Sequence, residues 1–126
     1  MQKIVSLARA GKPLLVVTDE VASPTYAEDL VPALISLLMT GRYGIYHLVN
    51  EGSASRYEFA RRILNCYGMP DYPVTPIIKA QYPRPSRPPT YSVLRNFNAA
   101  HIGIRLRPLQ EAVAAFVERE RMAANP

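Results

Sequence analysis

The sequence lacks several features on which common classes of protein depend. Its 126 residues include one cysteine, Cys66, so no disulfide can form within the chain, and the composition suits a reducing compartment. The N-terminus carries no secretory apolar segment, and no apolar run approaches the ~20 residues needed to cross a bilayer. These absences predict a cytoplasmic protein with no membrane partner.

Residue patterns for several kinds of chemistry are also missing. The two histidines lie 54 positions apart and, with a single cysteine, make no zinc-binding pattern. No serine occurs in a Gly-x-Ser-x-Gly sequence, so a nucleophile elbow for acyl transfer is absent. The six glycines do not cluster, so they cannot build a loop that cradles phosphate. We therefore predict no metal ligands and no cofactor-binding residues in this chain.

Acidic residues are absent from residues 72 to 110, and the whole chain carries a net charge of +5. This segment has three interpretations: a solvated basic face, a site where arginines grip an anionic ligand, or a nucleic-acid surface. It contains no helix-turn-helix, RNP or zinc-finger pattern, so we predict no nucleic-acid partner. The basic residues in the segment are Lys79, Arg84, Arg87, Arg95, Arg105 and Arg107.

The first third of the chain contains the pattern of a strand, a turn and a helix. The apolar, β-branched run at residues 14–18 predicts a buried strand. Pro24 fixes the turn, because its ring locks the backbone and prevents a helix from beginning earlier. Thr25 and Glu28 have the spacing of a capping box, which places a helix at residues 27–40.

The predicted helix at 27–40 has an apolar stripe and one awkward residue. Pro32 leaves two alternatives, because proline disrupts a helix interior: the cap is Asp29, or the helix kinks at the proline. Gly41 supplies the stop. The residues of the stripe recur at helical spacing and are Leu30, Leu34, Leu37 and Leu38.

The remaining elements follow from similar local signals. A strand at 45–49 comes after the first long helix, and such a helix is the crossover that a parallel strand pair needs. Prolines between residues 69 and 91 favour a stiff extended loop built into the fold, or alternatively a ligand for an SH3-like module. The other predicted elements are helices at 2–10, 55–68, 97–102 and from 108 onward, and an edge strand near 74–78. The helix at 55–68 is expected to begin with a Ser55-x-x-Glu58 capping box and to end at Gly68, and the helix at 97–102 to stop at Gly103. The helices at 55–68 and from 108 onward carry amphipathic stripes.

Four sequence blocks occur in order over roughly residues 10 to 117. They are the segment from Asp19 to Leu30, G-I-Y-H-L at 44–48, S-R-Y-E-F-A at 55–60 and R-P-x-x-Y-S-V-L at 87–94. Together they resemble bacterial dTDP-4-dehydrorhamnose reductases of the extended short-chain dehydrogenase/reductase group, in which the first block reads D-Q-x-G-S-P-T-Y-A-x-D-L. Departures from the family pattern are Glu20 for Gln, Ala22 for Gly, Arg56 for Trp, and Leu109 where Trp is common.

The resemblance implies a fold class and a division of the chain. The class is an α/β or α+β fragment with two or three short strands and about four helices. It corresponds to the C-terminal substrate-binding part of the family and lacks the Gly-rich Rossmann half. Residues 1–126 are expected to form a single truncated unit, with 1–50 a remnant of the parallel-sheet domain and 51–126 the substrate-binding region. Whether Met1 is a natural start is left open.

The resemblance also implies a function for the intact family enzyme. That enzyme reduces dTDP-4-dehydro-L-rhamnose to dTDP-L-rhamnose with NADPH, which supplies surface polysaccharide synthesis. None of the eight tyrosines here is followed four residues later by lysine, so the family's catalytic Tyr-x-x-x-Lys is missing, as is its glycine fingerprint. We therefore expect no catalytic residue, no NADPH binding and no activity from this chain alone. The alternative is a non-catalytic binding protein on the same fold, like the regulatory β subunit of methionine adenosyltransferase.

The resemblance further suggests ligand contacts for a dTDP-sugar. The Arg-Pro block lies beside the sugar-nucleotide cleft in the family, so Arg87 is the first candidate, because its guanidinium can neutralise a diphosphate. Arg84, Thr25 and Ser92 are weaker candidates. Glu20 would face the same cleft, where its carboxylate is expected to repel a diphosphate. A sheet without its neighbouring strands would leave an exposed edge, which a homodimer could cover.

Overall fold

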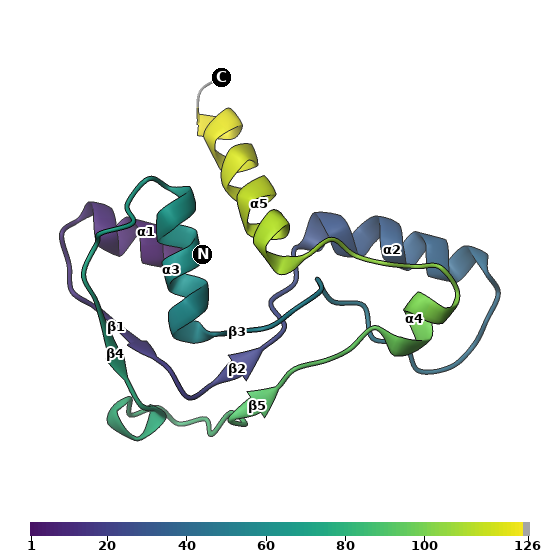
Figure 1. The fold of residues 1–126 in the computed structure, drawn as a ribbon, viewed down its shortest axis with the longest axis horizontal. Coiled ribbons are helices and arrows are strands. Elements are labelled where there is room, and N and C mark those ends of the chain that lie inside the picture. Colours follow the sequence, from purple (N-terminus) through teal and green to yellow (C-terminus); the bar gives the residue numbers. More distant parts are fainter. Residues whose placement is uncertain (125–126) are drawn as a thin grey trace.

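A computed structural model describes residues 1–124 of the chain (Figure 1). Within these residues it has five α-helices, five short strands and one 3₁₀-helix, so the expected α/β class is confirmed with more elements than predicted. In chain order the elements are α1 (Gln2–Arg9), β1 (Leu14–Val17), β2 (Val21–Ala22), α2 (Ala27–Met39), β3 (Ala54–Ser55), α3 (Arg56–Cys66), β4 (Val74–Ile77), the 3₁₀-helix η1 (Lys79–Gln81), β5 (Tyr91–Ser92), α4 (Phe97–His101) and α5 (Leu109–Ala124).

The strands form two small sheets that join segments far apart in the sequence. β1 and β4 pair in parallel, with Leu14 opposite Val74 and Val17 opposite Ile77. In the second sheet β2 lies in the middle, antiparallel to β3 and parallel to β5. Pro76 lies within β4, and the sheet accommodates it because an edge strand has a free side that needs no donor. The edge strand predicted near residues 74–78 is confirmed.

The strand predicted at residues 45–49 is wrong, and so is its parallel pairing with the first strand. β1 pairs with β4 instead, and residues 45–50 form an irregular segment with no strand partner in the described part of the chain. A side chain replaces the missing ladder: the Asn96 amide accepts from the Val49 N–H at 2.9 Å and donates to the Val49 carbonyl at 2.6 Å. A strand needs a neighbour for its backbone groups, and this segment has none.

The main core lies between α1, α3 and α5, and apolar side chains fill it. Ile63 and Leu64 of α3 are completely buried. Val113 of α5 is 2% exposed and packs with Ile63 and with Val5 of α1. The amphipathic stripes predicted for the helix at 55–68 and for the last helix therefore face each other, as expected from their helical spacing.

The start of α3 has the capping box predicted from its sequence. The Ser55 hydroxyl accepts from the Glu58 N–H at 3.1 Å, and the Glu58 carboxylate accepts from the Ser55 N–H at 2.7 Å. These two bonds satisfy donors that a helix start otherwise leaves free. Hydrogen bonding to the Ser55 backbone first, and to its side chain second, holds the pKa of Glu58 below its ordinary value.

The start of α2 differs from its prediction. The helix begins at Ala27 and runs through the proline to Met39, so the alternative with an Asp29 cap is wrong. The Thr25 capping box is wrong too, because the Thr25 hydroxyl donates to the Ser23 carbonyl at 3.2 Å. Asn50 fixes the entry to the helix instead: its Oδ1 accepts from the backbone N–H of Tyr26 at 2.7 Å.

The predicted apolar stripe of α2 is only partly covered: Leu30 and Leu37 are half-buried. Ala33 is buried against a second apolar cluster around α4, which includes Ala99 and Leu106. Leu34 and Leu38, in contrast, are 44% and 70% exposed. Figure 1 shows α2 and α4 at one end of the molecule, on the opposite side from α1 and β1. Within the described residues this face of α2 has no cover.

Candidate functional site

A cleft of about 260 Å³ opens where the three-stranded sheet meets the proline-rich segment. The central strand β2 brings three distant parts of the chain together there, because β3 and β5 lie on its two sides. Prolines and Phe59 supply most of the apolar wall. The residues that line the cleft are Glu20, Val21, Ala22, Pro24, Ala54, Ser55, Arg56, Phe59, Pro88, Pro89 and Ser92.

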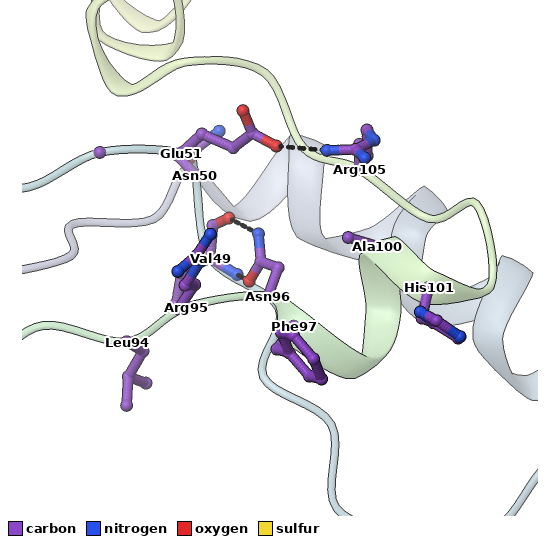
Figure 2. A pocket seen from close by; sticks show the side chains of 11 residues that line it. Val49, Asn50, Glu51, Leu94, Arg95, Asn96, Phe97, Ala100, His101 and Arg105 are labelled. Atoms are coloured by element: carbon purple, nitrogen blue, oxygen red, sulfur yellow. Dashed lines mark hydrogen bonds and ion pairs between the residues drawn. The ribbon is translucent and has the colours of Figure 1, made fainter.

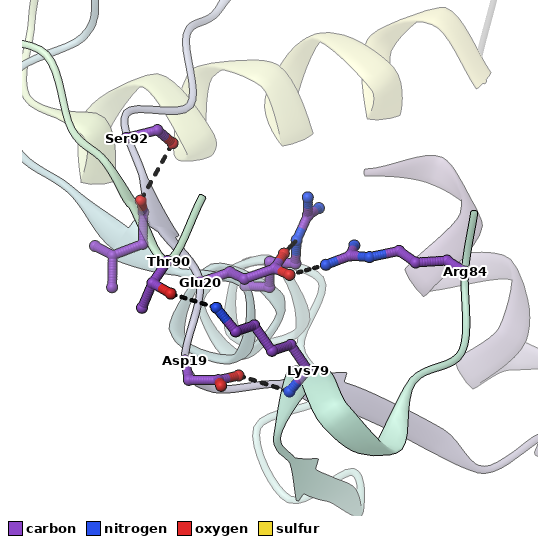
Figure 3. Close-up of polar contacts among 8 residues, drawn as sticks. Asp19, Glu20, Lys79, Arg84, Thr90 and Ser92 are labelled. Atoms are coloured by element: carbon purple, nitrogen blue, oxygen red, sulfur yellow. Dashed lines mark hydrogen bonds and ion pairs between the residues drawn. The ribbon is translucent and has the colours of Figure 1, made fainter. Parts of the chain in front are cut away.

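Glu20 is a buried carboxylate in this cleft, with 4% of its surface exposed. Its Oε2 lies 2.5 Å from Nε of Arg56, and its Oε1 forms an ion pair with Nη2 of Arg84 (Figure 3). A buried charge is costly unless it is paired, and each carboxylate oxygen here has its own guanidinium. Two positive charges and one negative charge leave the group with one positive charge.

The neighbouring polar contacts tie the proline-rich segment to the loop before β2. The Asp19 carboxylate accepts from the backbone N–H of Lys79 at 2.7 Å. The Lys79 ammonium in turn donates to the Thr90 hydroxyl, as Figure 3 shows. The first bond joins residues 79–90 to the residue next to Glu20, and the second joins the two ends of this segment, which also carries Arg84.

The structure brings three of the four predicted contact residues to the region of this cleft. Ser92 lines the cleft, and Arg84 reaches it through its ion pair. Arg87 is exposed beside the lining prolines and makes no ion pair within the described residues. Thr25 is absent from the lining and borders a separate hollow of about 20 Å³ against α5.

The pairing of Glu20 with Arg56 was missed by sequence reasoning. Both residues were noted as departures from a family pattern, but nothing in their 36-residue separation indicates contact. The backbone also joins them, because the Arg56 N–H donates to the Glu20 carbonyl at 3.1 Å. The expected repulsion between Glu20 and an anionic ligand stays a prediction, and the two guanidinium partners of the Glu20 carboxylate reduce its basis.

A second pocket, of about 450 Å³, lies between residues 49–52 and α4 (Figure 2). Its wall includes Arg105, whose Nη1 lies 3.6 Å from a Glu51 carboxylate oxygen. The buried amides in this wall are already engaged, since Asn96 bonds to Val49 and Asn50 bonds to three other groups. Figure 2 shows the Asn96 amide turned toward Val49. The cleft around Glu20 is the better candidate, because two arginines converge there on one buried carboxylate and Arg56 retains its terminal donors.

The described residues do not fit the pyrophosphate of a dinucleotide cofactor. Such a group binds at a glycine-rich turn that leads into a helix N-terminus, where backbone N–H groups point outward. Here the glycines lie in separate turns, and four of them follow helix C-termini. Those four are Gly11, Gly41, Gly68 and Gly103.

Comparison with known proteins identifies the family. The model of the RmlD substrate binding domain matches residues 1–122. The chain belongs to the RmlD substrate binding domain family. A dTDP-4-dehydrorhamnose reductase from Mycolicibacterium smegmatis is 40% identical over 117 residues, which cover 88% of this chain and 36% of the relative. The spore coat polysaccharide biosynthesis protein SpsK from Bacillus subtilis is 33% identical over 125 residues, which cover 99% of this chain and 44% of the relative.

A solved structure shows the same fold for this RmlD substrate binding domain. The dTDP-4-dehydrorhamnose reductase from Bacillus anthracis, in complex with NADP, superimposes with a TM-score of 0.86 at 28% identity. The match covers 93% of this chain and 42% of that protein. The chain thus spans less than half the length of these relatives and matches their substrate-binding part. Among the helices of residues 1–124, none combines the length and the apolar character required to traverse a membrane.

Proposed function

We propose that this chain is the sugar-nucleotide-binding part of a dTDP-4-dehydrorhamnose reductase, and that the cleft around Glu20 holds a dTDP-sugar. The observation that supports this most directly is the match of residues 1–122 to the RmlD substrate binding domain, combined with arginines at the cleft. The complete enzyme would reduce dTDP-4-dehydro-L-rhamnose to dTDP-L-rhamnose with NADPH. Residues 51–126 would supply most of the substrate contacts.

Arg87 is the proposed first contact to the diphosphate. It is exposed beside the cleft, and no carboxylate in the described residues pairs with it, so its guanidinium is available to an oxyanion. Arg84 and Ser92 are proposed as further contacts, because one pairs with Glu20 and the other lines the cleft. Thr25 is the weakest of the four proposals, since it lies outside the lining.

We propose that the hydride and proton transfer residues lie outside this sequence. The sequence contains no Tyr-x-x-x-Lys, and its glycines do not form a dinucleotide cradle. The exposed apolar face of α2 supports the same view, because large exposed apolar patches mark interaction surfaces. The relatives are more than twice as long, and we propose that the remainder of their fold covers this face.

Without that remainder, a second copy of the chain is the proposed cover for α2. We expect sedimentation velocity to show a homodimer whose fraction rises with concentration. Leu38→Glu should weaken it by placing a charge in the interface, because Leu38 is 70% exposed on this face. Ser36→Glu on the same helix is the control, and it should leave association intact. A monomer at every concentration would contradict the dimer.

The binding proposal is tested by calorimetric titration of the chain with dTDP and, separately, with NADPH. We expect dTDP to bind, NADPH not to bind, and NADPH not to be oxidised in the presence of substrate. Arg87→Ala should weaken dTDP binding about tenfold, the loss of one charge-assisted hydrogen bond. Arg42→Ala, at an exposed turn after α2, is the matched control. Equal dTDP affinity in Arg87→Ala and the parent protein would refute the Arg87 assignment.

A further inference from the structure

We propose that Glu20, Arg56 and Arg84 form a preset receptor for an oxyanion, in which Arg56 contacts the ligand and Glu20 is a positioning residue. The ligand group is a phosphoryl or carboxylate oxyanion. The assignment of this oxyanion to a nucleotide rests on the proposed function. The receptor itself is argued from the contacts of the three residues. We call these three residues the Arg–Glu–Arg triad.

Glu20 holds both arginines in place from a buried position. Its two oxygens face different guanidinium groups, at Arg56 Nε and at Arg84 Nη2. The backbone bond from the Arg56 N–H to the Glu20 carbonyl, 3.1 Å long, adds a second restraint on Arg56. Arg84 is further restrained by Tyr82, whose ring centroid lies 5.8 Å from the guanidinium carbon. A guanidinium held in this way loses less freedom when it binds a ligand.

Arg56 keeps its terminal nitrogens for a ligand. Only its Nε is used by Glu20, and its side chain is 58% exposed at the mouth of the cleft. Within residues 1–124 no acceptor pairs with its Nη1 or Nη2. These two nitrogens form one edge of a planar fork, which matches two oxygens of a phosphate or carboxylate. Arg56 therefore presents a bidentate donor while Glu20 fixes its orientation.

The surroundings of the triad favour binding of an anion over simple solvation. Phe59, Pro88 and Pro89 form apolar walls next to Arg56, and such walls strengthen electrostatic attraction inside the cleft. The triad carries one net positive charge, so an incoming anion meets attraction. If the three residues formed an ion-pair network with a structural role only, replacing Glu20 would leave the ligand affinity unchanged. An experiment can therefore distinguish the structural role from the positioning role.

Two departures from the family pattern are joined in this triad. This chain has Glu20 and Arg56 at positions where the pattern that it resembles has Gln and Trp. A buried carboxylate at position 20 would lose one of its two neutralising partners if position 56 held an indole, which has no charge. The two departures are thus physically complementary. The pair therefore adds an anion contact at position 56 to the one proposed at Arg87 in the Arg-Pro block.

Calorimetric titrations with inorganic pyrophosphate and with dTDP test the proposal. Arg56→Gln should weaken pyrophosphate binding about tenfold, and Arg56→Lys should also weaken it because a point charge cannot bind with the fork. Arg62→Gln, on the same helix but outside the cleft lining, should have no effect. Circular dichroism melts establish that each variant is folded.

Glu20→Gln separates positioning from charge. Removing a carboxylate adds net positive charge, so an electrostatic effect alone would raise the affinity for pyrophosphate. We expect the affinity to fall, because the amide cannot hold both arginines. A rise in affinity would overturn the positioning role. If Glu20→Gln fails to fold, unchanged pyrophosphate affinity in Arg56→Lys and Arg56→Gln would still overturn the proposal.

The two probes distinguish this proposal from the proposed function. Binding of dTDP that depends on Arg87 but not on Arg56 would refute the triad receptor and retain the function. Binding of pyrophosphate that depends on Arg56, without binding of dTDP, would support the receptor and refute the nucleotide assignment. Failure of both probes to bind would refute both.

Discussion

Replacing Asn50 by alanine should destabilise the fold, because Asn50 joins the start of α2 to the segment that leads into α5. Asn50 is completely buried, and its side chain bonds to three parts of the chain. Its Oδ1 accepts from the Tyr26 N–H at 2.7 Å, and its Nδ2 donates to the Asp29 carboxylate at 2.7 Å and to the Arg107 carbonyl at 3.1 Å. Asp29 also pairs with the Arg107 guanidinium at 2.8 Å.

The magnitude follows from these bonds. A hydrogen bond to a charged group contributes about 2 kcal/mol, and each of the two neutral bonds contributes about 1 kcal/mol. Asn50→Ala should therefore lower the free energy of unfolding by about 4 kcal/mol, because the three bonds are lost together and the Asp29 carboxylate left behind is buried. For a chain of this length such a loss lowers the melting temperature by about 15 °C.

Urea unfolding followed by circular dichroism measures this change, and Asn65→Ala is the control because Asn65 is exposed at the end of α3. The control should shift the free energy of unfolding by less than about 0.5 kcal/mol. Asn50→Asp should destabilise as well, since it sets a carboxylate against Asp29, and adding Asp29→Asn should recover part of the loss. A loss below about 1 kcal/mol for Asn50→Ala would refute the role assigned to these bonds.

Two further perturbations test the core and the helix cap. Ile63→Ala should cost about 2–5 kcal/mol because Ile63 is fully buried, whereas Ile45→Ala should change stability by less than about 0.5 kcal/mol because Ile45 is 80% exposed and lies outside α2. Urea unfolding compares the two, and equal losses would contradict the assigned burial. For the cap, the pKa of Glu58 is lowered from its ordinary value of 4.5. The contribution of Glu58 to the free energy of unfolding is therefore complete above pH 4.5 and is lost as the pH falls through the lower pKa of the folded state. Ser55→Ala should raise the pKa of Glu58 and reduce this acid dependence, which carboxyl NMR titration measures; a parent pKa at or above 4.5 would contradict it.

Local sequence signals predicted most of the helices. α3 begins at the Ser55 capping box and ends before Gly68, and α4 ends before Gly103, as expected. These signals work because caps and left-handed glycines act within one helical turn of the residue that carries them. The capping pattern at Thr25 failed, because Asn50, distant in the sequence, binds the backbone there instead.

The candidate site could be predicted only in part. The resemblance pointed to Ser92 and to the Arg-Pro block, and both lie at or beside the cleft. The pairing of Glu20 with Arg56 and Arg84 could not be predicted, because a single sequence carries no information on which charges meet after folding. The exposed stripe of α2 shows the same limit: helical spacing identifies an apolar face but not what covers it.

The sequence by itself determined the family, the positions of the main helices and the absence of a catalytic Tyr-x-x-x-Lys or a glycine fingerprint, because each depends on residues close together in the chain. Only the tertiary structure decided that β1 pairs with β4, that residues 45–50 form no strand, and that Glu20 is buried between two arginines. These outcomes depend on contacts between segments tens of residues apart. Backbone donors and buried charges find partners through the whole fold, and no local pattern specifies which partners those are.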